Sequence, residues 1–274
     1  MKKSTWVLIL ILLAALLVYG FVQRGGVVSG YTYSEANRYN VGGGEVKGNV
    51  KHIDLSWIAG SVNIEYHNGR EISVSEMAGK ILKADEQLRW RVDGDTLIVK
   101  YMASGFRTTR DLNKELTVLL PESLKLEKAE ISVVSADLKA EDLVCDELHV
   151  NSVSGSADLE VAEAKLVDAD TVSGPVWLTA KRVDKLDAAA VSGDLRFTFD
   201  RMPEKIEADA ISGSVEINLP ENAGVTVDFD TVSGDLHDAL GMTMVEKGRY
   251  VSGNGECRID VDTTSGDLRL NGEK

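Results

Sequence analysis

Hydrophobic and polar residues alternate along most of the chain in short runs, and these runs repeat. The copies align on one column of small residues: Ala59, Ser135, Ser154, Ser173, Ser192, Ser212, Ser233 and Ser265. From Ser135 onward the steps are 19, 19, 19, 20, 21 and 32 residues long. A recurring period near twenty residues is typical of a solenoid and not of an ordinary globular domain.

Within each copy, apolar residues stand six and four positions before the aligned residue, and three and five positions after it. This two-residue spacing predicts two short β-strands joined by a turn at Ser-Gly. Stacking the copies in register would merge their apolar columns into one core. The pattern therefore predicts an all-β, single-domain parallel β-solenoid over residues 51–272, in which Val176, Leu195 and Val215 touch in a dry interior.

The Ser-Gly pairs have a structural explanation. Glycine allows a positive φ at a corner, and serine can hydrogen-bond within its own turn. The alternative, a nucleophilic serine, would need a nearby base, but no copy carries a distinctive histidine. The chain has only four: His52, His67, His149 and His237. The sequence thus predicts no catalytic residue and no enzyme activity, because catalysis breaks the symmetry of a repeat.

Two segments depart from the short period. Residues 66–120 carry "EISVSE", "QLRWRVDGDTLIVKY" and "KELTVLLP", which we interpret as longer early coils of the same sheet. At the start of the chain, residues 6–22 form an uncharged run of seventeen residues, about 26 Å of helix. Lysines at positions 2 and 3 precede this run. It predicts a transmembrane signal anchor, with a cleaved signal peptide as the alternative.

The anchor also predicts where the rest of the chain lies. By the positive-inside rule, residues 1–5 are a cytoplasmic tail and the chain after the anchor is extracellular. Residues 23–50 are rich in glycine and are expected to form a stalk and the first strand. The expected localisation is the cell membrane, crossed once.

Several short motifs of the sequence, taken together, resemble a known family. "HIDLSWIAGSVNIEY", the "LTVLLP" strand, the serial "VSG" units and "IDVDTTSGDLRL" resemble the bacterial putative-adhesin family of β-strand-repeat domains of unknown function, over residues 45–272. The resemblance implies a β-solenoid on membrane-anchored surface proteins, mostly Gram-positive, some of them associated with envelope-stress genes. It supplies no catalytic residues.

Acidic residues change this picture, because they gather in two outward columns. The net charge of −14 and the pI near 4.8 argue against a nucleic-acid partner. Five and three positions before the aligned serine, nine of ten places over five coils are carboxylates, without Lys or Arg: Asp168, Asp170, Asp187, Glu207, Asp209, Asp228, Asp230, Asp260 and Asp262. They either keep the rod soluble or form a face that binds Ca²⁺, Mg²⁺ or a cationic partner. No metal ligand or other cofactor is assigned.

The outward column four positions after the serine has mixed charges and contains Trp177, which is expected to be exposed beside Arg196. The two side chains either make a cation–π contact or form a platform that binds sugar or protein. The two cysteines, Cys145 and Cys257, lie several coils apart and are predicted not to form a disulfide. Cys145 is expected to be buried.

Three functions fit these features. The first is a non-catalytic binding or structural module at the bacterial cell envelope, adhesin-like, which meets wall polymer, ions or another membrane protein. The second is an accessory or sensory subunit of an envelope-stress response, which rests on the family resemblance. The third is a β-helix enzyme acting on polysaccharides, which would need converging acidic and basic groups that the repeat does not display.

Overall fold

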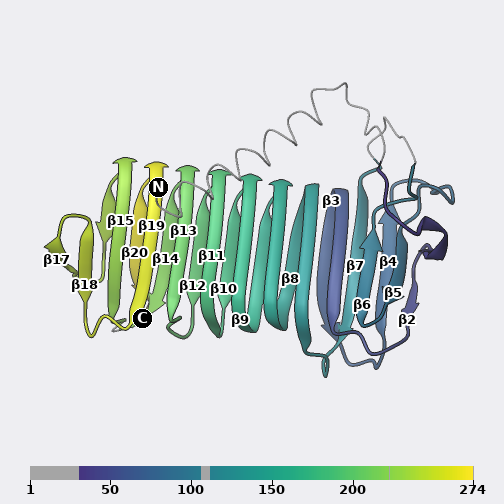
Figure 1. Cartoon of the computed structure of the whole chain (residues 1–274), viewed down its shortest axis with the longest axis horizontal. Coiled ribbons are helices and arrows are strands. Elements are labelled where there is room, and N and C mark those ends of the chain that lie inside the picture. Colours follow the sequence, from purple (N-terminus) through teal and green to yellow (C-terminus); the bar gives the residue numbers. More distant parts are fainter. Residues whose placement is uncertain (1–30, 106–111, 222, 274) are drawn as a thin grey trace.

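The protein is an elongated stack of β-strands (Figure 1). The computed structural model describes residues 31–105, 112–221 and 223–273. Apart from one short 3-10 helix, η1 (Ala36–Arg38), the regular elements of these residues are all strands. Each coil in the middle of the stack contributes two strands, one to each of its two faces. Neighbouring coils there run parallel. The all-β class and the parallel stacking are confirmed.

The middle of the stack follows the predicted register. Val176 pairs with Leu195, and Leu195 pairs with Val215, as equivalent positions of successive coils. Across the turn, Ser173, Ser192 and their counterparts also pair with one another. The strands concerned are β8 (Leu126–Ser154), β9 (Ala157–Ser173), β10 (Val176–Ala180), β11 (Val183–Ser192), β12 (Leu195–Phe199), β13 (Lys205–Ser212) and β14 (Val215–Pro220).

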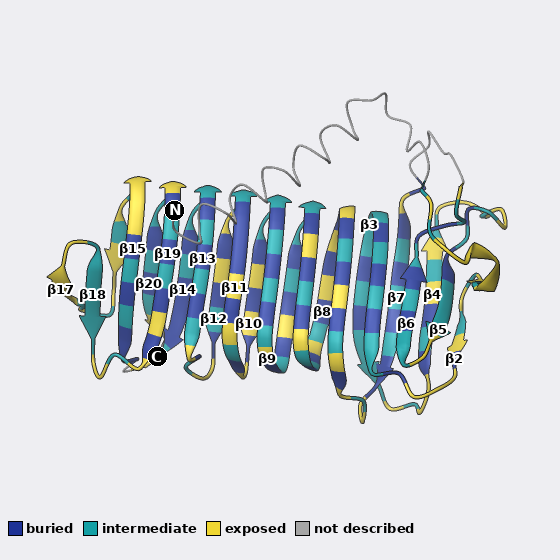
Figure 2. Cartoon of the chain, in the orientation of Figure 1, coloured by how far each residue is buried: buried dark blue, intermediate teal, exposed yellow. Residues whose placement is uncertain are grey.

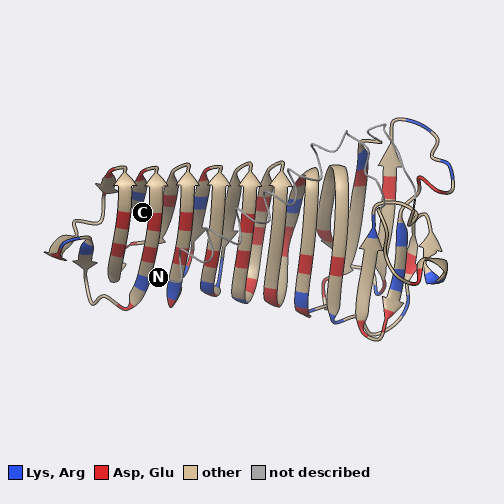
Figure 3. Cartoon of the chain, turned by 45° about the horizontal axis from the view of Figure 1, so that its top comes forward, with Lys and Arg blue, Asp and Glu red and all other residues tan. Residues whose placement is uncertain are grey.

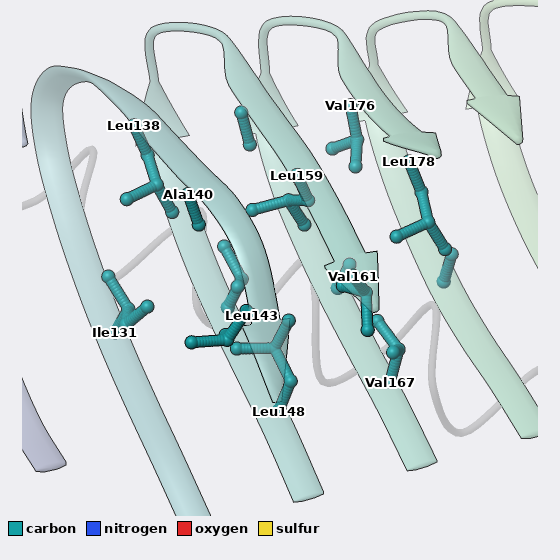
Figure 4. Packing of buried hydrophobic residues seen from close by; sticks show 14 of the residues in the cluster. Ile131, Leu138, Ala140, Leu143, Leu148, Leu159, Val161, Val167, Val176 and Leu178 are labelled. Atoms are coloured by element: carbon teal, nitrogen blue, oxygen red, sulfur yellow. The ribbon is translucent and has the colours of Figure 1, made fainter. Parts of the chain in front are cut away.

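The core lies between the two faces of the stack. Buried residues alternate with more exposed ones along the strands in the middle of the stack, such as β10 and β12 (Figure 2), because successive side chains of a strand point to opposite sides. Val176, Leu195 and Val215 are at most 1% exposed. Around Leu138, Leu159 and Leu178, side chains of successive coils point into one continuous interior (Figure 4). The predicted dry interior is confirmed.

Glycine follows six of the seven aligned serines, and the spacing of the coils requires it there. A Cβ added to Gly193 would lie 2.1 Å from the carbonyl oxygen of Gly174, and one added to Gly174 equally close to that of Gly155. Gly174 also has a φ of 137°, a conformation that favours glycine. The predicted corner is therefore present, and close backbone packing adds a second reason for the residue.

At the C-terminal end, the coils do not follow the order of the sequence. The expected serial stack is wrong here, since β19 lies between β13 and β15, and β20 lies between β14 and β16. Strand β18 then pairs antiparallel with β15, and β17 with β18. The bounds are β15 (Val225–Ser233), β16 (Leu236–Asp238), β17 (Thr243–Glu246), β18 (Arg249–Ser252), β19 (Cys257–Ser265) and β20 (Leu268–Glu273).

The N-terminal end also differs from the prediction. Strand β3 lies inside the stack, with β8 on one side and both β6 and β7 on the other, all parallel. Beyond them, β5 and β1 follow β6, and β4 and β2 follow β7, all antiparallel. Residues 66–120 are thus early coils only in part. The bounds are β1 (Asn40–Val41), β2 (Gly44–Val46), β3 (His52–His67), β4 (Ile72–Ala78), β5 (Arg89–Asp93), β6 (Thr96–Lys100) and β7 (Lys114–Pro121).

The residues expected to form a stalk fold, from residue 31 onward, against this N-terminal end. The hydroxyl of Tyr31 accepts a hydrogen bond from the backbone of Tyr101 at 3.0 Å. The hydroxyl of Tyr33 donates one to the carbonyl of Met102, also at 3.0 Å. The predicted anchor at residues 6–22 lies outside the described residues. Within those that are described, no helix is long and apolar enough to cross a membrane.

A buried lysine fills the interior at this end. Lys114 is fully buried, and its ammonium lies 2.7 Å from a carboxylate oxygen of Glu76 and 4.9 Å from the centre of the Trp57 ring. It also donates to the backbone carbonyls of Glu86 and Tyr101. Burial lowers the pKa of Lys114, and the carboxylate of Glu76 opposes that shift. The contacts supply the hydrogen bonds that a buried ammonium requires.

The cysteines lie on strands that do not touch. Cys145 is on β8 and Cys257 on β19, separated in the sheet by β9, β11 and β13. Both are buried free thiols, as expected for Cys145. Burial raises the pKa of each thiol to about 12, so neither is a ready nucleophile.

Candidate binding surfaces

The acidic residues form two adjacent columns on the face built by β9, β11, β13, β19 and β15, where Asp and Glu recur on neighbouring strands (Figure 3). Their spatial order follows the coils and not the sequence. The first column runs Asp168, Asp187, Glu207, Asp260, Asp228, and the second runs Asp170, Ala189, Asp209, Asp262, Asp230. The structure thus brings together all nine predicted carboxylates.

Counter-charges reach the first column from outside it. Arg249 on β18 donates to both carboxylate oxygens of Asp228, at 2.8 and 3.0 Å. Lys205 lies 2.8 Å from Glu207 on its own strand. The ten column positions hold no Lys or Arg, as the sequence shows, but residues outside them supply counter-charges to this column. Its other contacts are His149 with Asp168 (3.3 Å), Arg258 with Asp228 (3.4 Å) and Arg258 with Asp260 (3.8 Å).

The second column contains carboxyl groups that resist ionisation. Burial, followed by the negative charges of Asp168 and Asp187, raises the pKa of Asp170 to about 7. Burial and the neighbouring carboxylates, Asp262 foremost, raise the pKa of Asp209 to about 7 as well. Near neutral pH these two side chains are therefore only partly charged, which relieves repulsion along the column.

The columns do not converge on a point. Within the described residues, no three His, Cys, Asp or Glu side chains are arranged to hold a metal ion. Calcium needs six to eight oxygen ligands around one centre, whereas these carboxylates are spread along the row of strands. The arrangement supports an extended acidic face and supplies no preformed Ca²⁺ site.

The second surface is a hollow on the opposite half of the coils. Trp177 on β10 is 41% exposed, as predicted, and its neighbours in register are Asp158 and Arg196. It lines a hollow of about 490 Å³ close to the Ser-Gly turns. The turn residues Pro175, Gly193 and Asp194 line it as well, together with Arg196 on β12, Glu216 on β14 and Arg269 on β20.

Hydrogen bonds hold the polar groups of the hollow in place. Arg196 on β12 donates through Nε to a carboxylate oxygen of Glu216 on β14 at 3.1 Å, and its Nη2 lies 3.0 Å from the same oxygen in an ion pair. This ion pair, and not stacking on Trp177, is the contact that the structure records for Arg196. Asp194 accepts a hydrogen bond from the backbone of Ser214 at 2.9 Å. The aromatic ring is thus bordered by groups of fixed orientation.

Sequence reasoning missed part of this hollow. Serial stacking would place His237 beside Glu216, but the inserted coil places Arg269 there. It also overlooked a carboxylate two positions after the serine, which binds the backbone N–H of the adjacent coil. Asp137, Asp194 and Asp267 each do so, at 2.8, 2.9 and 3.1 Å. Their shared place in the repeat is the signal that could have revealed them.

Parallel coils with repeated outward columns define a class of all-β repeat proteins. Within that class, the sequence model of the Toastrack DUF4097 family matches residues 60–271, and the chain belongs to this family of unknown function. The resemblance to adhesin-type β-repeat domains is thereby confirmed. No curated protein matches the chain.

Two crystal structures are similar to the chain at low identity. One is of a putative cell adhesion protein from Clostridium sporogenes, at 11% identity over 86% of this chain and 100% of that one, with a TM-score of 0.40. The other is of a putative adhesin from Bacteroides fragilis, at 12% identity over 84% of this chain and 97% of that one, with a TM-score of 0.45.

Proposed function

We propose that the protein is a non-catalytic binding module, anchored in a bacterial cell membrane by residues 6–22 and displayed outside it. The observation that carries the binding role is the hollow around Trp177. Exposing a large aromatic side chain to water is energetically unfavourable. Exposed aromatic residues of this kind are enriched at binding sites. The neighbours of Trp177 are fixed by hydrogen bonds, so the surface is already organised for a ligand.

The contacts of Tyr31 and Tyr33 support an orientation of the rod relative to the membrane. Tyr31 and Tyr33 are bound to the N-terminal end of the stack. An anchor that ends a few residues earlier would hold this end near the membrane. The opposite end, with β17 and β18, would then point away from it, and the hollow would lie on the side of the rod. Such a module can reach wall polymer or a neighbouring membrane protein.

The acidic columns support a scaffold in preference to a reaction centre. Their carboxylates occupy equivalent positions on successive coils, whereas acid–base catalysis needs two groups with different environments. We propose that this face keeps the rod soluble and repels other acidic surfaces.

The proposal is tested by sedimentation of the full-length protein, in mild detergent, with isolated cell-wall material. We expect wild-type protein to sediment with the wall and the Trp177→Ala variant to remain in solution. Lys139→Ala is the matched control, because Lys139 stands in the same outward column two coils away. Wall binding that is equal in all three proteins would contradict the role of the hollow. Crosslinking to a membrane protein, without wall binding, would favour an accessory subunit.

A further inference from the structure

We propose that the hollow around Trp177 binds an uncharged sugar ring of a glycan, an inference that rests on the proposed binding function and names its ligand class. The hollow of about 490 Å³ falls within the range of about 300–1,000 Å³ that is usual for small-molecule sites. It is open to solvent and crosses the coils of β10, β12, β14 and β20. A ring that belongs to a longer polymer could therefore enter it without threading.

The aromatic ring supplies the apolar wall. One face of a pyranose ring presents C–H groups, which pack on a flat aromatic surface and release water from it. Trp177 is 41% exposed, so part of its side chain remains free for such packing. Gly193, in the turn of the next coil, also lines the hollow.

The polar border fits hydroxyl groups. A hydroxyl donates one hydrogen bond and accepts two, so it pairs with a carboxylate and a guanidinium held side by side. Glu216 and Arg196 are held in this way at 3.0 Å. The amide of Asn271 approaches the other carboxylate oxygen of Glu216 at 3.4 Å. Because these groups are already fixed, binding a hydroxyl costs little ordering of the protein.

Charge favours an uncharged ligand. The four charged residues of the lining, Asp194, Arg196, Glu216 and Arg269, sum to zero. Both arginines already face carboxylates, Glu216 and Asp267, at 3.0 and 3.1 Å. An anionic ligand would have to displace these partners and approach a chain of net charge −14. A cationic ligand would find stronger attraction on the acidic columns of the other face.

The test is a titration of full-length protein labelled with 5-fluorotryptophan, followed by ¹⁹F NMR. The chain has four tryptophans, and the Trp177 resonance is identified by its loss in Trp177→Phe. The probes are two uncharged sugars, the β-1,4-linked N-acetylglucosamine tetramer and maltotetraose, and one anionic probe, inorganic polyphosphate. We expect at least one sugar to shift the Trp177 resonance saturably, and polyphosphate to leave it unchanged.

Variants and wall binding separate the two proposals. Because Trp177→Ala lacks the reporter resonance, sugar binding by the variants is measured by isothermal titration calorimetry. Removing the aromatic ring in Trp177→Ala should weaken sugar binding about tenfold or more, whereas Lys139→Ala should bind as wild type does. Wall binding that depends on Trp177, without a sugar shift, overturns the sugar assignment and leaves the binding module intact. A shift caused by polyphosphate alone, or sugar binding that survives Trp177→Ala, also overturns it. Circular dichroism confirms that each variant is folded.

Discussion

Replacing one partly buried carboxylate of the acidic face should stabilise the protein, and the gain should grow as the pH rises from about 4 to about 7. Asp170 lies on β9, in the second acidic column, and its pKa is raised from 3.8 to about 7, first by burial and then by Asp168 and Asp187. In the unfolded chain this carboxyl would ionise near its ordinary pKa. A folded-state pKa above the unfolded value means that folding favours the protonated form.

The magnitude follows from this shift. Three pKa units would correspond to about 4 kcal/mol, but Asp170 is partly open to water on the outer face, and screening reduces the figure to about 1–2 kcal/mol. Coulomb's law gives a similar scale, since two like charges about 6 Å apart in water repel by about 0.7 kcal/mol. The stability that protonated Asp170 contributes to the folded protein is fully present below about pH 4 and is lost as the pH rises through about 7.

The assay is urea unfolding of the full-length protein in mild detergent, at pH 5 and pH 8. Asp170→Asn keeps the shape of the side chain and removes its charge. We expect the variant to be more stable than wild type by about 1–2 kcal/mol at pH 8, and the difference to shrink at pH 5. Other carboxyl groups, such as Asp267, whose pKa is lowered, also make the stability depend on pH. Their contribution is the same in variant and wild type, so it cancels when the two proteins are compared at one pH.

A matched control is Glu160→Gln, which removes an exposed carboxylate from the same strand. Its effect should stay within about 0.5 kcal/mol at both pH values. If Asp170→Asn proves neutral or destabilising at pH 8, or if its advantage is as large at pH 5, the assignment of a repelled, partly buried carboxyl is wrong.

Three further predictions concern the stack itself. Leu195→Ala should cost about 2–5 kcal/mol in urea unfolding, while the exposed Arg196→Ala should cost less than about 1 kcal/mol; equal costs would mean that the two faces of β12 are misassigned. Gly193→Ala forces a methyl group against a backbone carbonyl 2.1 Å away and should lower stability by about 2 kcal/mol or more, which an unchanged melting midpoint would contradict. Cys145 and Cys257 should react with maleimide only after unfolding.

The repeat could be predicted from the sequence because each column is seen many times. The apolar positions, the parallel register and the exposure of Trp177 all follow from a two-residue alternation aligned on the Ser-Gly turn. The order of the coils at the C-terminal end could not be predicted in the same way. Ile259 and Val261 in β19 match Val227 and Phe229 in β15 position for position. Either coil would therefore fit beside β13.

The sequence predicts those contacts of the candidate site that join equivalent positions of successive coils, and it does not predict the others. Trp177 and Arg196 belong to successive coils, so their pairing follows from the repeat. The ion pair of Arg249 with Asp228 does not, because Arg249 lies in the 32-residue step outside the repeat. Residues 66–120 show the same limit, since parallel and antiparallel strands share one alternation, and the pattern cannot distinguish β4 or β5 from a coil.

The path of the chain at the C-terminal end joins the stability of the rod to its site. A stack of parallel strands leaves unpaired backbone groups at each end. Here the last coil is paired on both sides, and the edge of β15 is covered by β18. The same insertion places β20 beside β14, and so brings Arg269 next to Glu216 in the hollow. Had the coils followed the sequence, His237 would stand beside Glu216, where Arg269 now neutralises the charge of the lining.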